Sequence, residues 1–275
     1  MGMWRALSHH WPEYLIEAAG LGIFMISASV FTAIFAYPGS PIAHALPNPI
    51  GRRLIVGMIM GLTAIGIIYS PWGRRSGAHI NPAVTLSFLW LHKIAPWDAF
   101  FYVFAQFVGG LAGVWITAAV LGKWIADPAV SYVVTIPGVP GMNVAFLAEL
   151  LMSFILMLVV LASSNTPRMA RFTGIFAGTL VALFIVVEAP LSGMSINPAR
   201  TFASALPSHV WTGAWLYFIA PPLGMIVASE FYLQSCGIKE VICAKLHHDS
   251  VHRCIFRCGY RGSLDTSEKV TVGRP

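Results

Sequence analysis

Long apolar runs, separated by short polar stretches, dominate the pattern of this chain. A helix of about 20 apolar residues crosses a hydrocarbon core of about 30 Å. Runs of roughly this length lie at 13–36, 51–71, 97–121, 143–163, 172–189 and 212–234. The first run carries Glu13 and Glu17 and is too long for a signal peptide, so it predicts a retained span. The pattern predicts an all-α membrane protein with six transmembrane helices.

Two further apolar segments are too short to cross a membrane, and each begins at an Ile-Asn-Pro-Ala sequence. The first, from Asn81 to Leu91, would form about 16 Å of helix, which is half of the hydrocarbon thickness. Asn is a favoured helix N-cap, and Pro is favoured at the first helical position. The sequence therefore predicts re-entrant half-helices at 81–91 and 197–206, whose boxes are Asn81, Pro82, Ala83 and Asn197, Pro198, Ala199.

The segments before these boxes, 76–80 and 193–196, must be non-helical backbone at membrane depth. Such backbone is tolerated only where it is buried in protein or lines a watery cavity. A pore is the simplest structure that meets this requirement.

Aligning the two boxes reveals an internal repeat. "YLIEAAGLGIFM" in the first span matches "FLAELLMSFILM" in the fourth, so that Glu17 pairs with Glu149. Each half, 1–135 and 136–235, then holds three spans and one half-helix, with a tail at 236–275. Because three is odd, the halves enter the membrane in opposite directions and form an inverted repeat. The two half-helix N-termini should therefore meet near the midplane.

Composition and charge agree with a membrane location. The chain is 57% hydrophobic and 10% charged, with a net charge of +6. Six spans place both termini on the same side of the membrane, and 13 of the 17 Lys and Arg residues then fall on that side. Cytoplasmic loops carry such an excess, so both termini are predicted in the cytoplasm, at a plasma or inner membrane. The positive charge thus reflects topology and an anionic leaflet, and not a nucleic-acid partner.

On these residues the chain resembles the major intrinsic protein family, the aquaporins and glycerol facilitators. The resemblance covers about 10–235 and rests on "SGAHINPAVT", "INPAR", the two repeated glutamates and "AQFVGG" in the third span. It implies a passive channel for water and other small neutral solutes, assembled as a homotetramer in the lipid bilayer. Nothing is chemically transformed, so it implies neither an enzyme nor a required cofactor. The paired half-helix dipoles and the amides of Asn81 and Asn197 would exclude ions and protons.

The resemblance also identifies a selectivity filter. Arg200, one turn after Asn197, corresponds to the family's constriction arginine, and a lone Arg inside a membrane is usually functional. The other filter positions fall at Met60 (or Gly61), Ile185 and Met194. Water-selective members usually carry an aromatic residue at the first position and His at the second. A Met or Ile on a helix is also typical of a packed core, so both interpretations stand.

Other markers resemble the water-channel branch. Thr201 follows Arg200 where glycerol facilitators place Asp, and Tyr217 with Phe218 forms the aromatic pair of water channels. The apolar filter instead favours less polar solutes, such as glycerol, ammonia, hydrogen peroxide or a dissolved gas. A third hypothesis is a closed, channel-like sensor that acts through its tail.

Three polar residues have expected supporting positions. The resemblance implies that Glu17 and Glu149 accept hydrogen bonds from the loops that carry the boxes. A proton relay is the alternative, but no ladder of Asp, Lys or His accompanies them. His79 faces the cytoplasmic vestibule in the family, and in this chain it either lines the pore or packs in the core.

The tail contains all four cysteines, and a cytoplasmic location argues against structural disulfides. Cys243 and His247 are four residues apart, as are Cys254 and Cys258, so two helices could present a Cys2His2 zinc site. Redox chemistry, lipidation or a reduced basic tail at the lipid surface are the alternatives. A metal-bound tail could cap the cytoplasmic mouth near His79.

Overall fold

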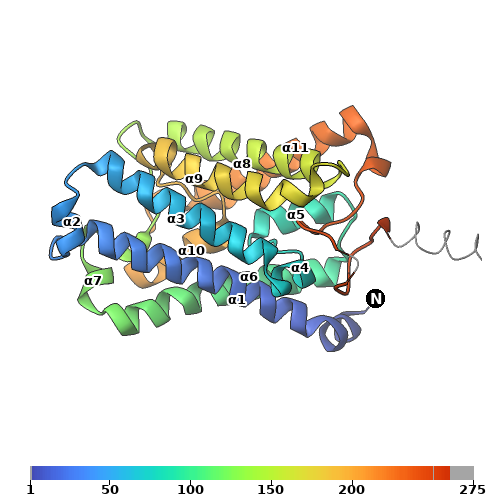
Figure 1. The fold of residues 1–275 in the computed structure, drawn as a ribbon, viewed down its shortest axis with the longest axis horizontal. Helices are drawn as coiled ribbons and strands as arrows, with labels where there is room; N and C mark the ends of the chain where they lie inside the picture. The colour runs from blue at the N-terminus through green and yellow to red at the C-terminus, as the bar shows by residue number, and fades with distance from the viewer. Residues whose placement is uncertain (1, 250, 261–275) are drawn as a thin grey trace, which may run out of the picture.

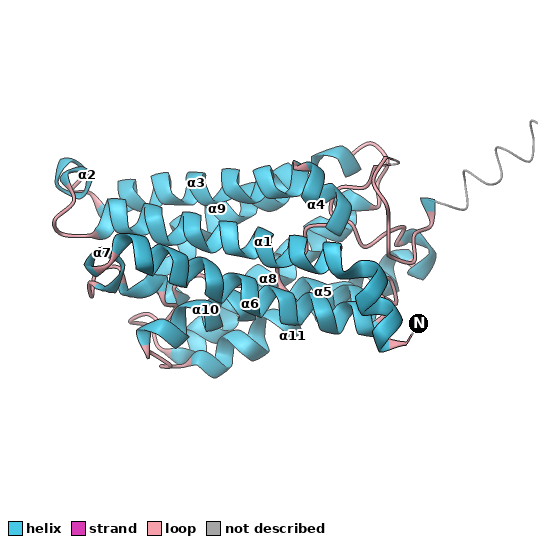
Figure 2. Cartoon of the chain, turned by 90° about the horizontal axis from the view of Figure 1, so that it is seen from below, coloured by secondary structure: helices cyan, strands magenta, loops and turns pink. Residues whose placement is uncertain are grey.

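The computed structural model describes residues 2–249 and 251–260, and within them every regular element is helical (Figures 1 and 2). Six of the described helices are long and apolar enough to cross a membrane. These are α1 (Met3–Ala36), α3 (Pro49–Tyr69), α6 (Pro96–Leu121), α8 (Met142–Ser164), α9 (Thr173–Ser192) and α11 (Ala214–Cys236). The predicted fold class is confirmed, and the six spans lie roughly along the long axis of the molecule.

The first helix is longer than its apolar run predicts, since it begins at Met3 and not near residue 13. The added turns are held by burial of Ala6 and by a polar contact of His10, and Tyr14, at the start of the predicted run, joins that contact. The ring nitrogen Nδ1 of His10 lies 2.8 Å from Oδ1 of Asp98 in α6, and the Tyr14 hydroxyl donates to the same oxygen at 2.6 Å. Hydropathy alone gives no signal for such an extension.

The half-helices are α5 (Pro82–Trp90) and α10 (Pro198–Ser208). Each has Pro at its first position and Asn as its N-cap, with extended backbone at Asn81 and Asn197. Short helices complete the connections: α2 (Pro41–Ala45), α4 (Pro71–Ser76), α7 (Lys123–Ala126), η1 (Ser131–Val133), η2 (Ala170–Phe172) and η3 (Ile238–Glu240).

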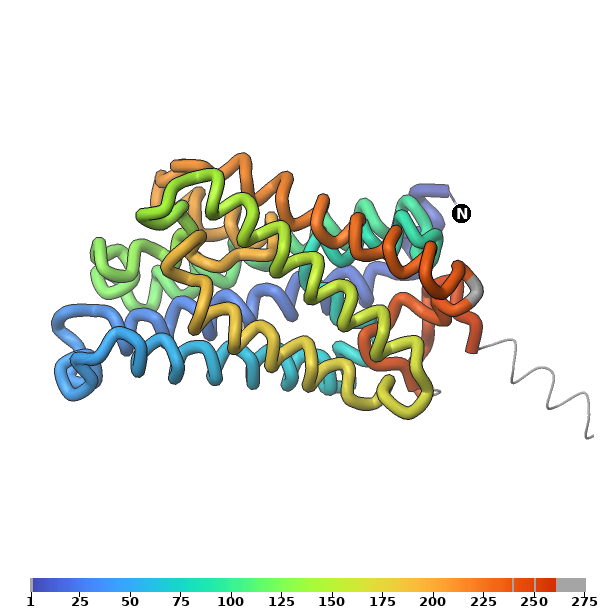
Figure 3. The backbone as a smooth tube through the Cα atoms, turned by 90° about the horizontal axis from the view of Figure 1, so that it is seen from above, coloured from blue at the N-terminus to red at the C-terminus, as the bar shows by residue number. Residues whose placement is uncertain are grey.

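The packing follows the inverted repeat. Helix α1 packs along α6 as α8 packs along α11, and α3 meets its counterpart α9 across the centre of the bundle. Each half-helix lies against the third span of the other half, α5 on α11 and α10 on α6. The N-terminus and the tail lie at the same end of the bundle, named here the tail face (Figure 3).

The contact between α3 and α9 depends on glycine. A Cβ atom on Gly61 would lie 2.6 Å from the carbonyl oxygen of Gly178, and one on Gly178 would lie 2.6 Å from the carbonyl oxygen of Gly61. Small residues allow such close backbone approach in lipid, where helices associate mainly by packing. Gly61 therefore faces the neighbouring helix.

We expect Gly61→Ala to destabilise the protein by about 1–3 kcal/mol, because the added methyl group meets backbone that cannot move aside. Gly66→Ala on the same helix is the matched control, since a Cβ there has open space. The control should be neutral or slightly stabilising, because Ala favours helix over Gly by about 1 kcal/mol. Thermal unfolding in detergent measures both variants. Equal melting temperatures would show that α3 and α9 are not this close.

Candidate pore

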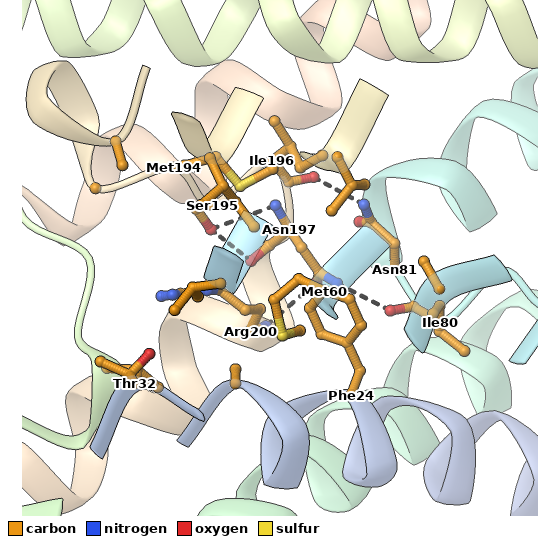
Figure 4. A pocket seen from close by; sticks show the side chains of 18 of the residues that line it. Phe24, Thr32, Met60, Ile80, Asn81, Met194, Ser195, Ile196, Asn197 and Arg200 are labelled. Atoms are coloured by element: carbon orange, nitrogen blue, oxygen red, sulfur yellow. Dashed lines mark hydrogen bonds between the residues drawn. The ribbon is translucent and has the colours of Figure 1, made fainter. Parts of the chain in front are cut away.

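The two Asn-Pro-Ala boxes meet in the middle of the bundle and cross-link the halves (Figure 4). Nδ2 of Asn81 donates to the carbonyl oxygen of Ile196 at 2.7 Å, and Nδ2 of Asn197 donates to the carbonyl oxygen of Ile80 at 2.9 Å. Each amide oxygen caps its own half-helix, accepting from the backbone N–H of Ala83 or Ala199. An amide group carries two N–H hydrogens, so each Asn retains one hydrogen beyond these bonds.

The loops before the boxes have strained backbone. Ile80 has a φ of 40° and Ile196 a φ of 49°, in the left-handed region that β-branched residues avoid. Gly77 and Gly193 occupy the same region without strain and end the preceding helices. Strain of about 1–3 kcal/mol per residue persists only where surrounding contacts hold the loop in place.

Glu17 supplies such contacts for the first loop. Its Oε1 accepts from the Ser76 hydroxyl at 2.7 Å and from the His79 backbone N–H at 3.1 Å. Its Oε2 accepts from the Ile80 backbone N–H at 2.6 Å and from Nε2 of Gln106 at 2.8 Å. The carboxylate is fully buried, and hydrogen bonds compensate for that burial.

Glu149 repeats the arrangement in the second loop. Its Oε1 accepts from the Ser192 hydroxyl at 2.5 Å and from the Ser195 backbone N–H at 2.7 Å, and its Oε2 accepts from the Ile196 backbone N–H at 2.6 Å. A tyrosine adds to each loop, because Tyr102 donates to the Ser76 carbonyl and Tyr217 to the Ser192 carbonyl. The internal repeat thus extends to individual hydrogen bonds.

A cavity of about 620 Å³ passes the boxes and contains the four predicted filter positions. Met60, Ile185, Met194 and Arg200 all line it, together with both box asparagines. Of the two residues considered in the second span, Met60 contributes to this lining while Gly61 packs on Gly178. In the first half, Val84 lies at the position equivalent to Arg200 and also lines the cavity.

Arg200 lines this cavity. Its backbone N–H is bonded to Oδ1 of Asn197 at 3.2 Å, which fixes the start of α10. Its Nη1 is buried and has no hydrogen-bond partner among the described residues. Most Lys and Arg residues lie on the side of the termini, but Arg52 and Arg53 lie on the other side. Both line the cavity at the face opposite the tail. This mouth is therefore positively charged.

His79 lies at the tail end of the cavity and is only 2% exposed. Its Nε2 donates to the carbonyl oxygen of Ala244 at 2.8 Å, and its ring stacks on Phe256 with 5.4 Å between ring centroids. Both of these partners belong to the tail. His79 is thus a cavity-lining residue and a packed residue at once.

The tail brings four metal-type ligands together, but they are not the four predicted. One ligand atom from each of Cys243, His248, Cys254 and Cys258 lies within 4.8 Å of every other. His247 was predicted in place of His248; instead its ring packs edge-on against Tyr69, with centroids 4.9 Å apart. The prediction is wrong because the segment is irregular rather than helical, so a four-residue spacing does not select one face.

Two thiols of the cluster favour the thiolate form. The hydrogen bond that the Cys243 thiol donates to Cys254 lowers the pKa of Cys254, and interaction with the Cys243 thiol also lowers the pKa of Cys258. Burial lowers the pKa of Lys245, an effect opposed by the nearby thiolate of Cys254. Thiolates, and not thiols, are the form that binds metals.

Several cavity and loop residues have no signal in the sequence. Phe24 and Thr32 of α1 line the cavity (Figure 4). Val130, the residue before η1, and Val133, its last residue, also line it. In isolation they resemble ordinary span or loop residues. Gln106, which donates to Glu17, lies within "AQFVGG", so that motif marked its position without indicating its partner.

Comparison with known proteins places this geometry in a channel family. The profile of the family described as "Major intrinsic protein" matches residues 7–232. Aquaporin NIP2-2 of Zea mays is 34% identical over 230 residues, which cover 83% of this chain and 74% of that protein. Aquaporin NIP6-1 of Arabidopsis thaliana is 34% identical over 207 residues, covering 74% of this chain and 65% of its own length.

Among solved structures, the aquaglyceroporin from Plasmodium falciparum has a TM-score of 0.68 at 22% identity, covering 81% of this chain and 95% of that one. At this identity the likeness concerns the fold alone. The profile and the relatives together show that the chain belongs to the major intrinsic protein family. It is an integral membrane protein of a channel family and not an enzyme.

Proposed function

We propose that this chain conducts water and small neutral solutes passively, and that Asn81, Asn197 and Arg200 exclude ions and protons. The observation that carries this proposal is the meeting of the two half-helix N-termini in one cavity, beside an arginine whose Nη1 has no partner among the described residues. Each N-terminus carries roughly half a positive charge, so a cation there meets a repulsive field. Uncharged molecules avoid this penalty.

The filter residues support solutes beyond water. Met60, Ile185 and Met194 offer no strong donor or acceptor from their side chains to replace lost hydration. Glycerol-like solutes carry carbon surface that can contact such side chains, while their hydroxyls can bond to Arg200. The apolar side chains of the filter therefore also favour the alternative hypothesis, a channel for less polar solutes such as glycerol.

We expect the double variant Met60→Phe, Ile185→His to lower glycerol permeability at least several-fold and to leave water permeability within a small factor. The bulky ring narrows the constriction, and the imidazole competes with solute hydroxyls for the remaining space. Light scattering from proteoliposomes measures both rates, by swelling in glycerol and by shrinkage under an impermeant osmolyte. An unchanged ratio of the two rates would mean that these residues do not form the filter.

We further propose that the tail face is cytoplasmic and that four chains assemble, each with its own pore. The excess of Lys and Arg beside the termini supports the orientation. The family's usual assembly supports the tetramer. Conduction through such a pore needs no cofactor, and the Cys/His cluster lies on the tail, so a zinc ion held there would act on access to the pore.

A further inference from the structure

The cysteine and histidine cluster is compact enough for its four ligand atoms to hold one metal ion. Sγ of Cys243 lies 3.6 Å from Sγ of Cys254, and Sγ of Cys258 lies 3.2 Å from Nε2 of His248. A tetrahedral zinc ion with Zn–S bonds of about 2.3 Å places two sulfur ligands about 3.8 Å apart. A disulfide would instead need about 2.05 Å and would leave the other two ligands without a role.

The ligand set and its surroundings favour zinc. Three thiolates with one imidazole form a common structural zinc site, and soft sulfur ligands disfavour magnesium and calcium. Cys243 and Cys254 are buried and His248 and Cys258 are half-buried, and four protein ligands leave no open position for a substrate. Three thiolates around Zn²⁺ carry one net negative charge. Lys245, only 1% exposed, places a compensating ammonium beside them, and its Nζ donates to the carbonyl oxygen of Arg253 at 2.8 Å.

The same stretch of tail lies across the end of the pore. Leu246 lines the pore cavity, and its backbone N–H donates to the carbonyl oxygen of Gly77 at 3.1 Å. Ala244 and Phe256 contact His79, at the tail end of that cavity. Ala244, Leu246 and Phe256 are each less than a tenth exposed. These three residues are named here the plug. Along the chain, Ala244 and Leu246 lie between the ligands Cys243 and His248, and Phe256 lies between Cys254 and Cys258.

Further contacts fasten the tail to the tail face. They come from segments that are far apart in the sequence: the first turns of α1, the loop after α5 and the residue after α8. The Arg257 backbone N–H donates to the Lys93 carbonyl at 2.9 Å, the Ile242 backbone N–H to Oδ1 of Asn165 at 2.8 Å, and Nη1 of Arg253 to the His9 carbonyl at 3.0 Å.

We propose that Cys243, His248, Cys254 and Cys258 bind one zinc ion, and that this ion holds the tail in the shape that plugs the pore. The tail has no regular helix or strand among residues 241–249 and 251–259, so backbone pairing does not set its shape. Four ligands converging on one ion can fix such a segment, as in small zinc domains. Loss of the ion should release the plug and open the mouth. The proposal that the tail plugs the pore depends on the proposed channel function, whereas the proposal of a zinc site does not.

Zinc content tests the site without any measurement of transport. The full chain, purified without chelator, should hold about one zinc ion per chain by elemental analysis. His248→Ala should lose most of it, while the adjacent His247→Ala should retain it. Cys236→Ser, at an exposed cysteine outside the cluster, is a second control. Cobalt in place of zinc should give the visible absorption of tetrahedral thiolate ligation. A zinc-free protein, equal zinc in both histidine variants, or a Cys243–Cys254 disulfide would each overturn the site.

Water flux tests the plug. In proteoliposomes of the full chain, a zinc chelator should raise osmotic water permeability at least several-fold, and added zinc should reverse the change. Phe256→Ala should raise permeability while the protein keeps its zinc, because it removes a plug contact and no ligand. If water permeability rises in Phe256→Ala but does not change when zinc is removed from or added to the full chain, the proposal that the metal controls the plug is overturned. Absence of flux in every sample would overturn the plug and count against the channel, while zinc content would still decide the site.

Discussion

Replacing Glu149 by Ala is expected to lower the free energy of unfolding by about 5 kcal/mol, enough to prevent recovery of folded protein. The Ser192 hydroxyl and the backbone N–H groups of Ser195 and Ile196 would lose their acceptor at a buried site. Each unsatisfied buried donor costs about 1–3 kcal/mol. The Ile196 backbone is also strained and depends on these contacts. Thermal unfolding in detergent, followed by size-exclusion profile, measures the loss.

Glu240→Ala provides the control, since Glu240 is exposed and follows the last span. It should match the parent protein. Glu149→Gln should fall between the two, because one carbonyl oxygen survives while the new amide meets donors rather than acceptors. A Glu149→Ala protein as stable as the parent would show that the second loop holds its shape without this carboxylate.

Arg200→Val is expected to raise the permeability to protons and small cations about tenfold to a thousandfold, with water flux preserved. A unit charge at about 4 Å and an effective dielectric constant of about 20 contributes about 4 kcal/mol to a cation barrier. Each 1.36 kcal/mol of barrier changes a rate about tenfold. Val is chosen because Val84 occupies the equivalent place in the first half, so the bundle already holds this side chain one turn after a box asparagine.

A pH-sensitive dye inside proteoliposomes reports the leak after an external pH step. Lys123→Val is the control, because it removes one positive charge from an exposed site outside the cavity lining. It should leave the proton leak unchanged. If Arg200→Val conducts water but excludes protons as well as the parent, the half-helix dipoles and the box asparagines provide the exclusion without it.

The sequence predicts the frame of the pore because that frame repeats. Six apolar runs specify six spans, and a run half as long after Asn-Pro specifies a half-helix whose N-cap is that Asn. The pairing of Glu17 with Glu149 across the repeat marked two residues whose equivalent hydrogen bonds the structure then shows. Where the same physical constraint acts on both halves, a residue that recurs at the equivalent position of each half is predicted to have the same role in both.

The remaining features have no such constraint in the sequence. The box amides bond to carbonyl oxygens of Ile80 and Ile196, and backbone atoms carry no sequence signature. The tail has no counterpart in the first half and no helical period, so its spacing suggested His247 where the fold presents His248. The plug depends on contacts between segments more than 150 residues apart, such as His79 with Ala244.

The most direct test of the central claim is shrinkage of proteoliposomes under an impermeant osmolyte, over a range of temperatures, with protein-free liposomes as the baseline. The measurement should include the full chain with and without zinc chelator and a chain ending at Gly237, where the last span is complete. We predict shrinkage well above baseline with a low activation energy, at least where the tail is released or absent. Shrinkage at the baseline rate in all three samples, with no uptake of glycerol, would contradict a channel for water and small neutral solutes.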